Sequence, residues 1–305
     1  MTTSSQNKID ESFESFRPLL FSIAYRMLGS ASEAEDILQE AYLRYSAAES
    51  REISELKPYL CTIVTNLCLD FLKSARVQRE RYIGPWLPEP VLTGEHYANP
   101  YETAEQHESL SQAFLVLLES LTPPERAVFL LREVFDFDYQ EIAAVIGKSA
   151  ANCRQLCHRA KAFIAERQHR FDASRETHLR LITSFLQACQ EGDVRGLQDL
   201  LAQDVITWGD GGGKTPAALR PIIGVEAVAR LWLGLARKTP ADLTISIEDV
   251  NGSPAALLWM GDTLYSVVTF DVADGKIKAI RNVLNPDKLA YISRQLSTNS
   301  QSGAT

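Results

Sequence analysis

The residue pattern changes near Ser174, and this change limits the folds that the 305 residues can adopt. Before Ser174, apolar residues recur three and four positions apart, which is typical of amphipathic helices. After it, strand-forming runs are separated by Asn251-Gly252 and Asp274-Gly275, pairs that favour tight hairpin turns. We therefore predict a multidomain protein with an all-α N-terminal part and an α+β C-terminal part built on a curled antiparallel sheet.

A segment rich in glycine and proline divides the helical part. These residues fill six of the 17 positions from 84 to 100, and no helical periodicity crosses them. At about 150 residues per domain, the chain is long enough for more than one domain. The predicted parts are a first helical domain at 8–80, a linker at 81–106, a second helical domain at 107–172, an α+β domain at 174–292 and a flexible tail at 293–305.

The first helical domain is predicted to hold two amphipathic helices with different polar faces. Ser30, followed by Glu33, predicts a capping box at the start of one helix, and Pro58 suits the first turn of the next. The polar face of the first helix comprises Asp36, Gln39 and Glu40. The polar face of the second comprises Asn66, Asp70 and Lys73. The basic residues Lys73, Arg76 and Arg79 could contact backbone phosphates. Taken alone, such faces are most simply interpreted as solvated surface.

The second helical domain ends in a helix-turn-helix pattern. Gly147 separates a short helix at 139–146 from a helix at about 149–163, and two helices joined by a tight turn often have glycine there. In DNA-binding proteins the second helix enters the major groove, where Arg pairs with guanine and Asn or Gln with adenine. An ordinary helical hairpin is the alternative. The polar residues on this helix are Ser149, Asn152, Arg154, Gln155, His158, Arg159 and Lys161.

The charge distribution supports local rather than bulk contact with nucleic acid. The net charge of the chain is −8, which argues against coating DNA by overall charge. Residues 142–171 nevertheless hold six basic residues and one acidic residue, and a second basic stretch runs from 73 to 81. Two short basic segments on an acidic body are expected to bind free DNA poorly.

The cysteines predict neither disulfides nor a metal site. There are five, an odd number without framework spacing, which fits a reducing, cytoplasmic location. Cys153 and Cys157 fall on the apolar side of their helix, and no second ligand pair completes the four ligands that structural zinc requires. We expect no metal, no cofactor, no secretory leader and no membrane-spanning segment.

Ordered motifs in the helical part carry a resemblance to a known family. Residues 32–42, 58–73, 121–132, 139–149 and 151–160 together resemble the sigma-70 family, in the extracytoplasmic function group that keeps only the second and fourth sigma regions. This resemblance implies a transcription initiation factor that binds core RNA polymerase and promoter DNA. Asp36, Gln39 and Glu40 would meet the β′ clamp helices, and the fourth region would meet the β flap.

The same resemblance assigns the DNA contacts. Asn66, Lys73, Arg76 and Arg79 would lie beside the −10 element, with the segment 49–57 near its flipped bases. The helix-turn-helix would recognise the −35 element through the seven polar residues named above. An ordinary helix-turn-helix repressor is a rival interpretation, but the helix at 32–45 that resembles a clamp-binding helix argues against it.

Three further motifs resemble sigma factors fused to a SnoaL-like domain, group 41 of the extracytoplasmic function type. They are Trp86-Leu-Pro-Glu-Pro90, Asp210-Gly-Gly-Gly-Lys214 and Asn285-Pro-Asp-Lys-Leu289. The resemblance implies an NTF2-like cone fold for 174–290 that regulates the sigma regions in cis. Our hypothesis is that the three motifs meet. Their residues are Trp86, Leu87, Pro88, Asp210, Gly211, Gly212, Gly213, Lys214, Asn285, Pro286, Asp287, Lys288 and Leu289.

The alternative for the C-terminal domain is a ligand-binding module or an enzyme of the isomerase or cyclase type. Domains of this fold often enclose a pocket for a small apolar ligand. Asp262 and Asp271 are the carboxylates that strands would present, and no histidine follows His178. The strands therefore lack a His–Asp acid–base pair, and we expect no catalytic residues here.

Overall fold

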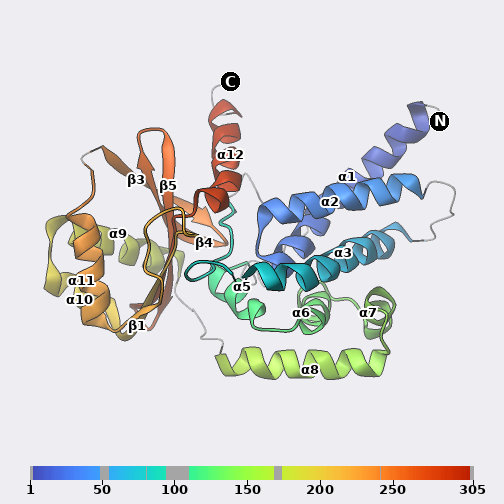
Figure 1. Cartoon of the computed structure of the whole chain (residues 1–305), viewed down its shortest axis with the longest axis horizontal. Coiled ribbons are helices and arrows are strands. Elements are labelled where there is room, and N and C mark those ends of the chain that lie inside the picture. Colours follow the sequence, from blue (N-terminus) through green and yellow to red (C-terminus); the bar gives the residue numbers. More distant parts are fainter. Residues whose placement is uncertain are drawn as a thin grey trace. The chain divides into compact units, whose positions relative to one another are not determined.

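The computed structural model describes residues 3–48, 55–79, 81–93, 110–167, 174–240 and 242–302, and the side chains of 3–9, 75–79 and 299–302 are not described. The chain divides into two compact units (Figure 1). The described residues of 1–80, 98–110 and 114–168 form the first unit. Those of 81–97, 111–113 and 169–305 form the second. The described part of the linker therefore belongs to the same unit as the C-terminal region.

Helices make up the first unit. They are α1 (Thr3–Leu28), α2 (Ala31–Ala47), α3 (Leu56–Arg79), α5 (Gln112–Glu119), α6 (Pro123–Phe129), the π-helical turn η2 (Leu130–Val134), α7 (Tyr139–Ile146) and α8 (Ala150–Arg167). Ser30 caps α2 as predicted, because its hydroxyl accepts the backbone N–H of Glu33 at 3.2 Å. Thr122 and Glu125 form a capping box at α6.

Helix α3 lies at the centre of the first unit. It packs on α1 and α2 on one side and on α6 and α7 on the other. Leu60, Val64 and Cys68 are fully buried along it. The buried Arg126 of α6 donates a hydrogen bond to the carbonyl of Met27 at the end of α1. The segments predicted as two helical domains are thus in direct contact within this unit.

The second unit combines four helices with a six-stranded sheet among its described residues. The helices are α9 (Arg175–Glu191), α10 (Val194–Leu200), α11 (Val225–Ala236) and α12 (Pro286–Ser302). The strands are β1 (Leu201–Asp210), β2 (Ile222–Ile223), β3 (Leu243–Val250), β4 (Ser253–Met260), β5 (Thr263–Ala273) and β6 (Lys276–Val283). Their order across the sheet is β2-β1-β6-β5-β4-β3.

The two predicted hairpin turns and the strands that flank them are present in the second unit, and the predicted arrangement of the sheet needs one correction. Strands β3 to β6 form an antiparallel meander, and both residues of Asn251-Gly252 and Asp274-Gly275 have positive φ, as tight hairpin turns require. The sheet is not antiparallel throughout, because β1 pairs with β6 in parallel. A parallel pair needs a long connection, here the whole segment from α11 to β5, so no local turn signalled it.

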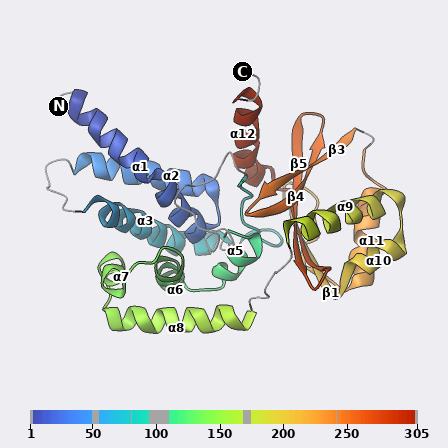
Figure 2. The ribbon, with the colours of Figure 1, turned by 180° about the vertical axis from the view of Figure 1, so that it is seen from behind.

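Helices α9, α10 and α11 cover one face of the sheet (Figures 1 and 2). The core between them contains Phe185, whose ring meets Trp232 and Phe270 edge to face at centroid distances of 5.4 and 5.3 Å. Helix α12 packs against β5. The fold class is confirmed: an all-α part is followed by an α+β domain.

Helix α12 continues to Ser302, through residues for which we predicted a flexible tail from 293. Ile292 is fully buried, and the side-chain oxygen of Gln295 accepts the backbone N–H of Leu92 at 2.9 Å. Leu92 and Gln295 are 203 residues apart in the sequence, so a distant segment of the chain holds this helix. A polar, Ser-rich sequence gives no sign of such a contact.

Candidate functional sites

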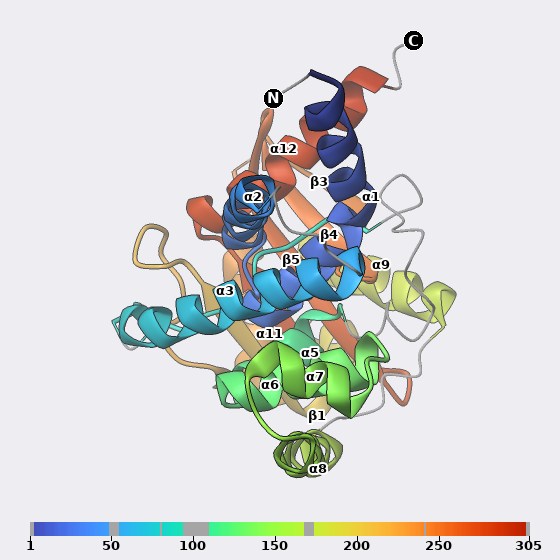
Figure 3. The same cartoon turned by 90° about the vertical axis from the view of Figure 1, so that its right-hand side faces the viewer.

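The helix-turn-helix is fixed by caps at each corner. The Asp138 side chain accepts the backbone N–H groups of Gln140 and Glu141 and starts α7. Gly147 ends α7 in the left-handed conformation with φ of 66°. Ser149 then accepts the N–H of Asn152 at 3.2 Å and starts α8. Figure 3 shows α8 nearly along its axis, beside α7.

Helix α8 presents the predicted −35 residues on one exposed face. Cys153, Leu156, Cys157 and Ala160 are buried on the opposite side, as the pattern predicted, and burial raises the pKa of both thiols. Ser149 is used as a helix cap. The exposed polar residues of α8 are Asn152, Arg154, Gln155, His158, Arg159 and Lys161.

The three basic residues of this face have different partners. Arg159 Nε lies 2.9 Å from Glu125 Oε1, and Lys161 Nζ lies 2.7 Å from Glu133 Oε2. The guanidinium carbon of Arg154 lies 5.3 Å from the ring centroid of Tyr139. Two of the cations are therefore neutralised in part by carboxylates, and the third contacts an aromatic ring.

The acidic face of α2 contains an apolar residue that the sequence interpretation missed. Asp36 and Gln39 are exposed, and Glu40 pairs with Arg44 at 2.7 Å. Leu43 follows at the next helical position of the same face and is 60% exposed. A single exposed apolar side chain is common on protein surfaces, so Leu43 adds an apolar centre to this face without identifying a partner. The signal was the spacing of 36, 39, 40 and 43.

On α3, Asn66 and Lys73 lie on an exposed polar face as predicted. The Lys73 ammonium is 2.8 Å from the Asp70 carboxylate. Arg76 and Arg79 belong to α3, but their side chains are outside the described residues. Residues 49–54 of the loop expected near the −10 bases also lie outside them.

The linker motif at 86–90 and the two C-terminal motifs at 210–214 and 285–289 meet in the second unit around Asp210. This carboxylate is fully buried at the end of β1. It accepts hydrogen bonds from the Tyr82 hydroxyl at 2.5 Å, the Leu87 backbone N–H at 2.8 Å and the Lys288 ammonium at 2.7 Å. The backbone oxygen of Asp210 accepts the N–H groups of Leu284 and Asn285. We call this cluster the linker site: Tyr82, Trp86, Leu87, Asp210, Gly212, Asn285 and Lys288.

Lys288 is the second charged group of the linker site and is 6% exposed. Its ammonium also donates to the carbonyl of Leu87. It lies 4.1 Å from the ring centroid of Trp86 and 4.8 Å from that of Tyr82. A buried cation needs both a counter-charge and hydrogen bonds, and cation–π contacts add to these when water is excluded. The linker therefore supplies one carbonyl and two aromatic rings that surround the ammonium of this lysine.

Gly212 permits the close approach of the loop to the linker. Its φ is +57°, and a Cβ there would lie 2.2 Å from Asn285 Nδ2 and 2.9 Å from the Tyr82 hydroxyl. The same Asn285 Nδ2 donates to the Tyr82 hydroxyl at 2.9 Å. Burial, followed by the bond to Asp210, raises the pKa of Tyr82. Tyr82 precedes the motif at 86–90, and the sequence interpretation missed it.

The remaining predicted regulatory residues surround the linker site. Lys214 pairs with Asp287 at 2.6 Å on the surface. Leu289 is buried on α12, and Pro286 begins that helix. The Pro88 carbonyl accepts a hydrogen bond from Gln112, and Gly211 and Gly213 continue the loop against Thr215 and Ile83. The predicted regulatory residues therefore all lie in one region of the second unit.

The linker continues along the edge of the sheet. Every residue from 87 to 92 is buried. Leu92 pairs with Val250 as an antiparallel bridge, and the Val91 carbonyl accepts the N–H of Asn251 at 2.9 Å. The described linker is thus an added part of the C-terminal domain. The side chains of Asn251 and Gln295 accept backbone N–H groups of the linker. In the sequence one is a turn residue and the other an ordinary polar residue, so neither could be predicted to hold the linker.

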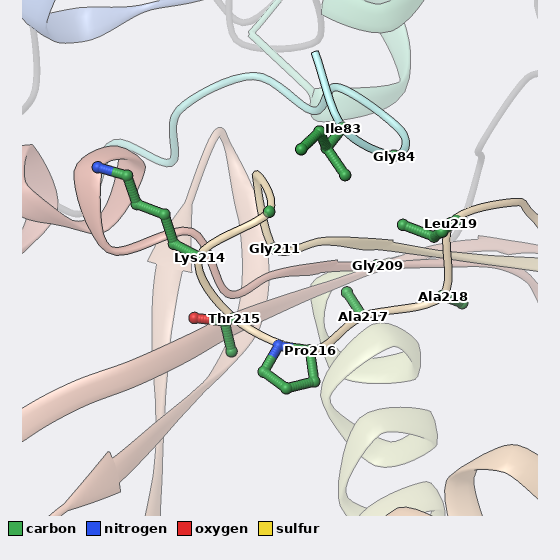
Figure 4. Close-up of a pocket in the computed structure, with 11 residues that line it drawn as sticks. Ile83, Gly84, Gly209, Gly211, Lys214, Thr215, Pro216, Ala217, Ala218 and Leu219 are labelled. Atoms are coloured by element: carbon green, nitrogen blue, oxygen red, sulfur yellow. The ribbon is translucent and has the colours of Figure 1, made fainter.

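Two cavities lie among the described residues of the second unit, and one of them borders the linker. One, of about 380 Å³, lies between Ile83–Gly84 of the linker and the loop after β1 (Figure 4). Its walls are mainly glycine backbone, Ala217, Ala218 and Leu219. The other, of about 680 Å³, lies between β3, the β4–β5 turn and α12. The first falls in the size range of small-ligand pockets and touches the linker directly.

The carboxylates considered for catalysis are not arranged as a reactive pair. Asp262 is exposed in the β4–β5 turn, and Asp271 pairs with Arg281 at 2.6 Å. His178 is near enough to Asp271 for that charge to favour its protonation, but burial is the larger effect and lowers the pKa of His178. Among the described residues, no group of three metal-ligating side chains converges, and no helix is long and apolar enough to cross a membrane.

Comparison with known proteins identifies the family. The sigma-70 region 2 model matches residues 12–77 and the sigma-70 region 4 model matches residues 111–164. The chain is 35% identical to the ECF RNA polymerase sigma factor SigJ of Mycobacterium tuberculosis over 286 residues, covering 90% of this chain and 91% of that protein. The chain belongs to the extracytoplasmic function sigma factors.

Two further comparisons extend this identification across the C-terminal domain. This sigma factor is 30% identical over 300 residues to the probable ECF RNA polymerase sigma factor SigI of M. tuberculosis, covering 96% of the chain and 99% of the relative. The crystal structure of SigJ from M. tuberculosis matches with a TM-score of 0.73 at 33% identity and covers 92% of the chain and 98% of that structure. The sigma factor fold thus includes the second unit.

Proposed function

We propose that this sigma factor binds core RNA polymerase in the cytoplasm and directs transcription from promoters through their −10 and −35 elements, with its C-terminal domain regulating that activity in cis. The similarity to sigma factors along nine-tenths of the chain carries the proposal. The C-terminal part of the proposal rests on the linker site, because the segment joining the sigma regions is held there by buried polar contacts.

The polymerase contact is assigned to the α2 face formed by Asp36, Gln39, Glu40 and Leu43. An exposed leucine ringed by carboxylate and amide groups fits a basic partner surface with an apolar centre. The β′ clamp helices are the proposed partner of this face, and the β flap is the proposed partner of the fourth region. Both are expectations that the resemblance supplies.

The DNA contacts are assigned to α3 and α8. Asn66, Lys73, Arg76 and Arg79 are proposed to face the −10 element. The exposed polar residues of α8 are proposed to enter the major groove at −35, with Ser149 at the start of the helix. Two local basic surfaces on an acidic protein favour recognition within the polymerase complex over binding to free DNA.

The compact first unit supports a change of arrangement on promoter binding. The two elements lie about 25 base pairs apart, or roughly 85 Å of duplex. A compact unit of roughly 150 residues is only about 40 Å across. With Arg126 of α6 bound to Met27 of α1, α3 and α8 cannot reach both elements at once. The packed state is therefore proposed as the inactive one.

The C-terminal domain is proposed to bias this change through the linker. Residues 82–93 are bound to Asp210, Lys288, Asn251 and Gln295, which limits the length of chain free to separate the sigma regions. Control requires a ligand or partner that binds the two states differently. The 380 Å³ cavity beside Ile83 is the proposed place for a small apolar ligand. An isomerase or cyclase activity is not proposed, since Asp262 and Asp271 lack a reactive arrangement.

Transcription with purified core polymerase and genomic DNA tests the function, with transcript ends mapped. The proposal predicts discrete start sites that share −35 and −10 words. Leu43→Ala should reduce both polymerase binding and output, whereas Val194→Ala, which changes an exposed apolar residue of α10, should reduce neither. Start sites no more frequent than with core polymerase alone would contradict the sigma assignment.

A further inference from the structure

Tyr139 stands between the two helices of the helix-turn-helix. It is the first residue of α7, and its ring contacts the guanidinium groups of Arg132 and Arg154, each with its central carbon 5.3 Å from the ring centroid. Arg154 lies on α8, on the face proposed to meet the −35 element. An aromatic side chain of one helix thus contacts a DNA-facing cation of the other.

The Tyr139 ring is itself held from several sides. The Asp138 cap fixes the backbone at the start of α7. The Cys157 thiol near the Tyr139 hydroxyl, together with burial, raises the pKa of Tyr139. Arg132 is held by the Phe137 carbonyl at 2.9 Å and by Asp136 at 3.6 Å. The ring therefore offers Arg154 a fixed support.

Arg154 differs from the other cations of α8 in what its nitrogen atoms do. Arg159 and Lys161 are bound to Glu125 and Glu133. Among the described residues, no carboxylate or carbonyl pairs with Arg154, whose contact is with the Tyr139 ring. A guanidinium whose contact is with an aromatic ring keeps N–H groups available for hydrogen bonds. Two such groups match the O6 and N7 acceptors of guanine.

We propose that Tyr139 is the positioning residue for Arg154, holding its guanidinium so that it reads one guanine of the −35 element. This inference rests on the proposed function. The aromatic ring of Tyr139, and not its hydroxyl, determines how strongly Arg154 prefers guanine. Arg154 touches the base, and Tyr139 acts through Arg154.

The test uses the full chain with core polymerase and a promoter found by transcript mapping, in which each −35 base pair is replaced in turn. Arg154→Ala identifies the base pair whose identity no longer matters. Tyr139→Leu should lower the preference for guanine at that same pair by about two- to fivefold, the size of a cation–π contact. Tyr139→Phe, which keeps the ring, should stay within about twofold of wild type.

Further variants separate positioning from folding. Adding Tyr139→Leu to Arg154→Ala should cause no additional loss of preference. Arg154→Lys keeps the charge but not the planar fork, so it should weaken the guanine preference without abolishing it as Arg154→Ala does. Unfolding curves of each variant show whether α7 and α8 remain folded.

Several results would overturn the inference. Equal losses at every −35 pair would mean that Tyr139 is only structural. A Tyr139→Phe defect as large as that of Tyr139→Leu would assign the effect to the hydroxyl and Cys157. Discrete start sites that do not depend on Arg154 would refute the inference while leaving the sigma function intact, and no discrete start sites at all would refute both.

Discussion

The linker site and helix α8 differ in whether regular secondary structure and a buried environment occur together. Residues 82–93 form neither helix nor strand beyond one bridge, yet Leu87 is 2% exposed and Val91 5%. Helix α8 is regular along 18 residues, but its predicted DNA face is exposed and its ion pairs lie on the surface. Regular secondary structure and a fixed environment are therefore separate properties of this chain.

The difference has a physical cause. A buried backbone without a ladder must satisfy its N–H and C=O groups through side chains. Asp210, Asn251, Gln295 and Lys288 do this for the linker. The exposed face of α8 needs no such partners, since water can satisfy its polar groups. The linker is held by its own chain, whereas the exposed face of α8 is left open to solvent, as the proposed DNA contact requires.

The largest effect is expected from breaking the buried pair of the linker site. Lys288→Met leaves the Asp210 carboxylate buried without its counter-charge, which should lower the free energy of unfolding by about 3–5 kcal/mol. Lys214→Met removes the exposed pair with Asp287 and should change it by less than about 1 kcal/mol. Urea unfolding of both variants measures the difference. Equal effects would mean that burial does not distinguish the two pairs.

The next effect concerns the close approach at Gly212. Gly212→Ala should destabilise the protein by about 1–2 kcal/mol through its positive φ and by about 1–3 kcal/mol more through contact with Asn285 and Tyr82. Gly261→Ala is the matched control, because Gly261 has φ of +58° and nothing within 4 Å of its Cβ position. The difference in thermal unfolding between Gly212→Ala and Gly261→Ala gives the part of the destabilisation that comes from steric contact. Identical losses would show that the loop yields to the added methyl group.

A smaller, pH-dependent effect is expected from His178 in the second unit. Burial lowers its pKa from 6.5, against the opposing charges of Asp271 and Asp249. A base whose pKa is lower in the folded state gives stability that is present above pH 6.5 and is lost as the pH falls through that value. Urea unfolding between pH 8 and pH 5 should show this loss, and His178→Leu should flatten it. A variant with the wild-type slope would exclude His178 as its source.

The smallest stability effect is expected on α8. Arg159→Ala removes an exposed ion pair and should change the free energy of unfolding by less than about 1 kcal/mol. If Arg159 contacts a phosphate, the salt dependence of promoter binding by the polymerase complex should fall in slope by about 0.9. Measuring promoter affinity at several salt concentrations checks this. An unchanged slope would leave Arg159 without a phosphate contact.

The same contrast explains what the sequence could predict. The helix-turn-helix depends on local signals, such as Gly147 and the buried Cys153, so its boundaries and faces were predictable. The linker site joins Leu87 to Asp210 across 123 residues and Lys288 to Asp210 across 78. Only the family resemblance suggested that these motifs meet, and neither Tyr82 nor Asn251 was predicted to take part.

Other misses have equally particular causes. Strand β1 pairs in parallel with β6 and has no adjoining turn to mark it. Leu43 was missed because it is apolar and the predicted face was chosen by its polar residues, although its spacing from Asp36, Gln39 and Glu40 places it on the same face. The DNA and polymerase roles of the exposed residues stay predictions, because exposure alone does not identify a partner.

Transcription by core polymerase with the wild-type chain, Lys288→Met and Lys214→Met tests the central claim most directly. Output is measured from mapped promoters per molecule of sigma factor bound to polymerase. The account predicts that Lys288→Met, which releases the linker, changes this output several-fold, whereas Lys214→Met matches wild type. Equal output from all three proteins, with Lys288→Met shown to have a released linker by proteolysis, would contradict control through the linker site.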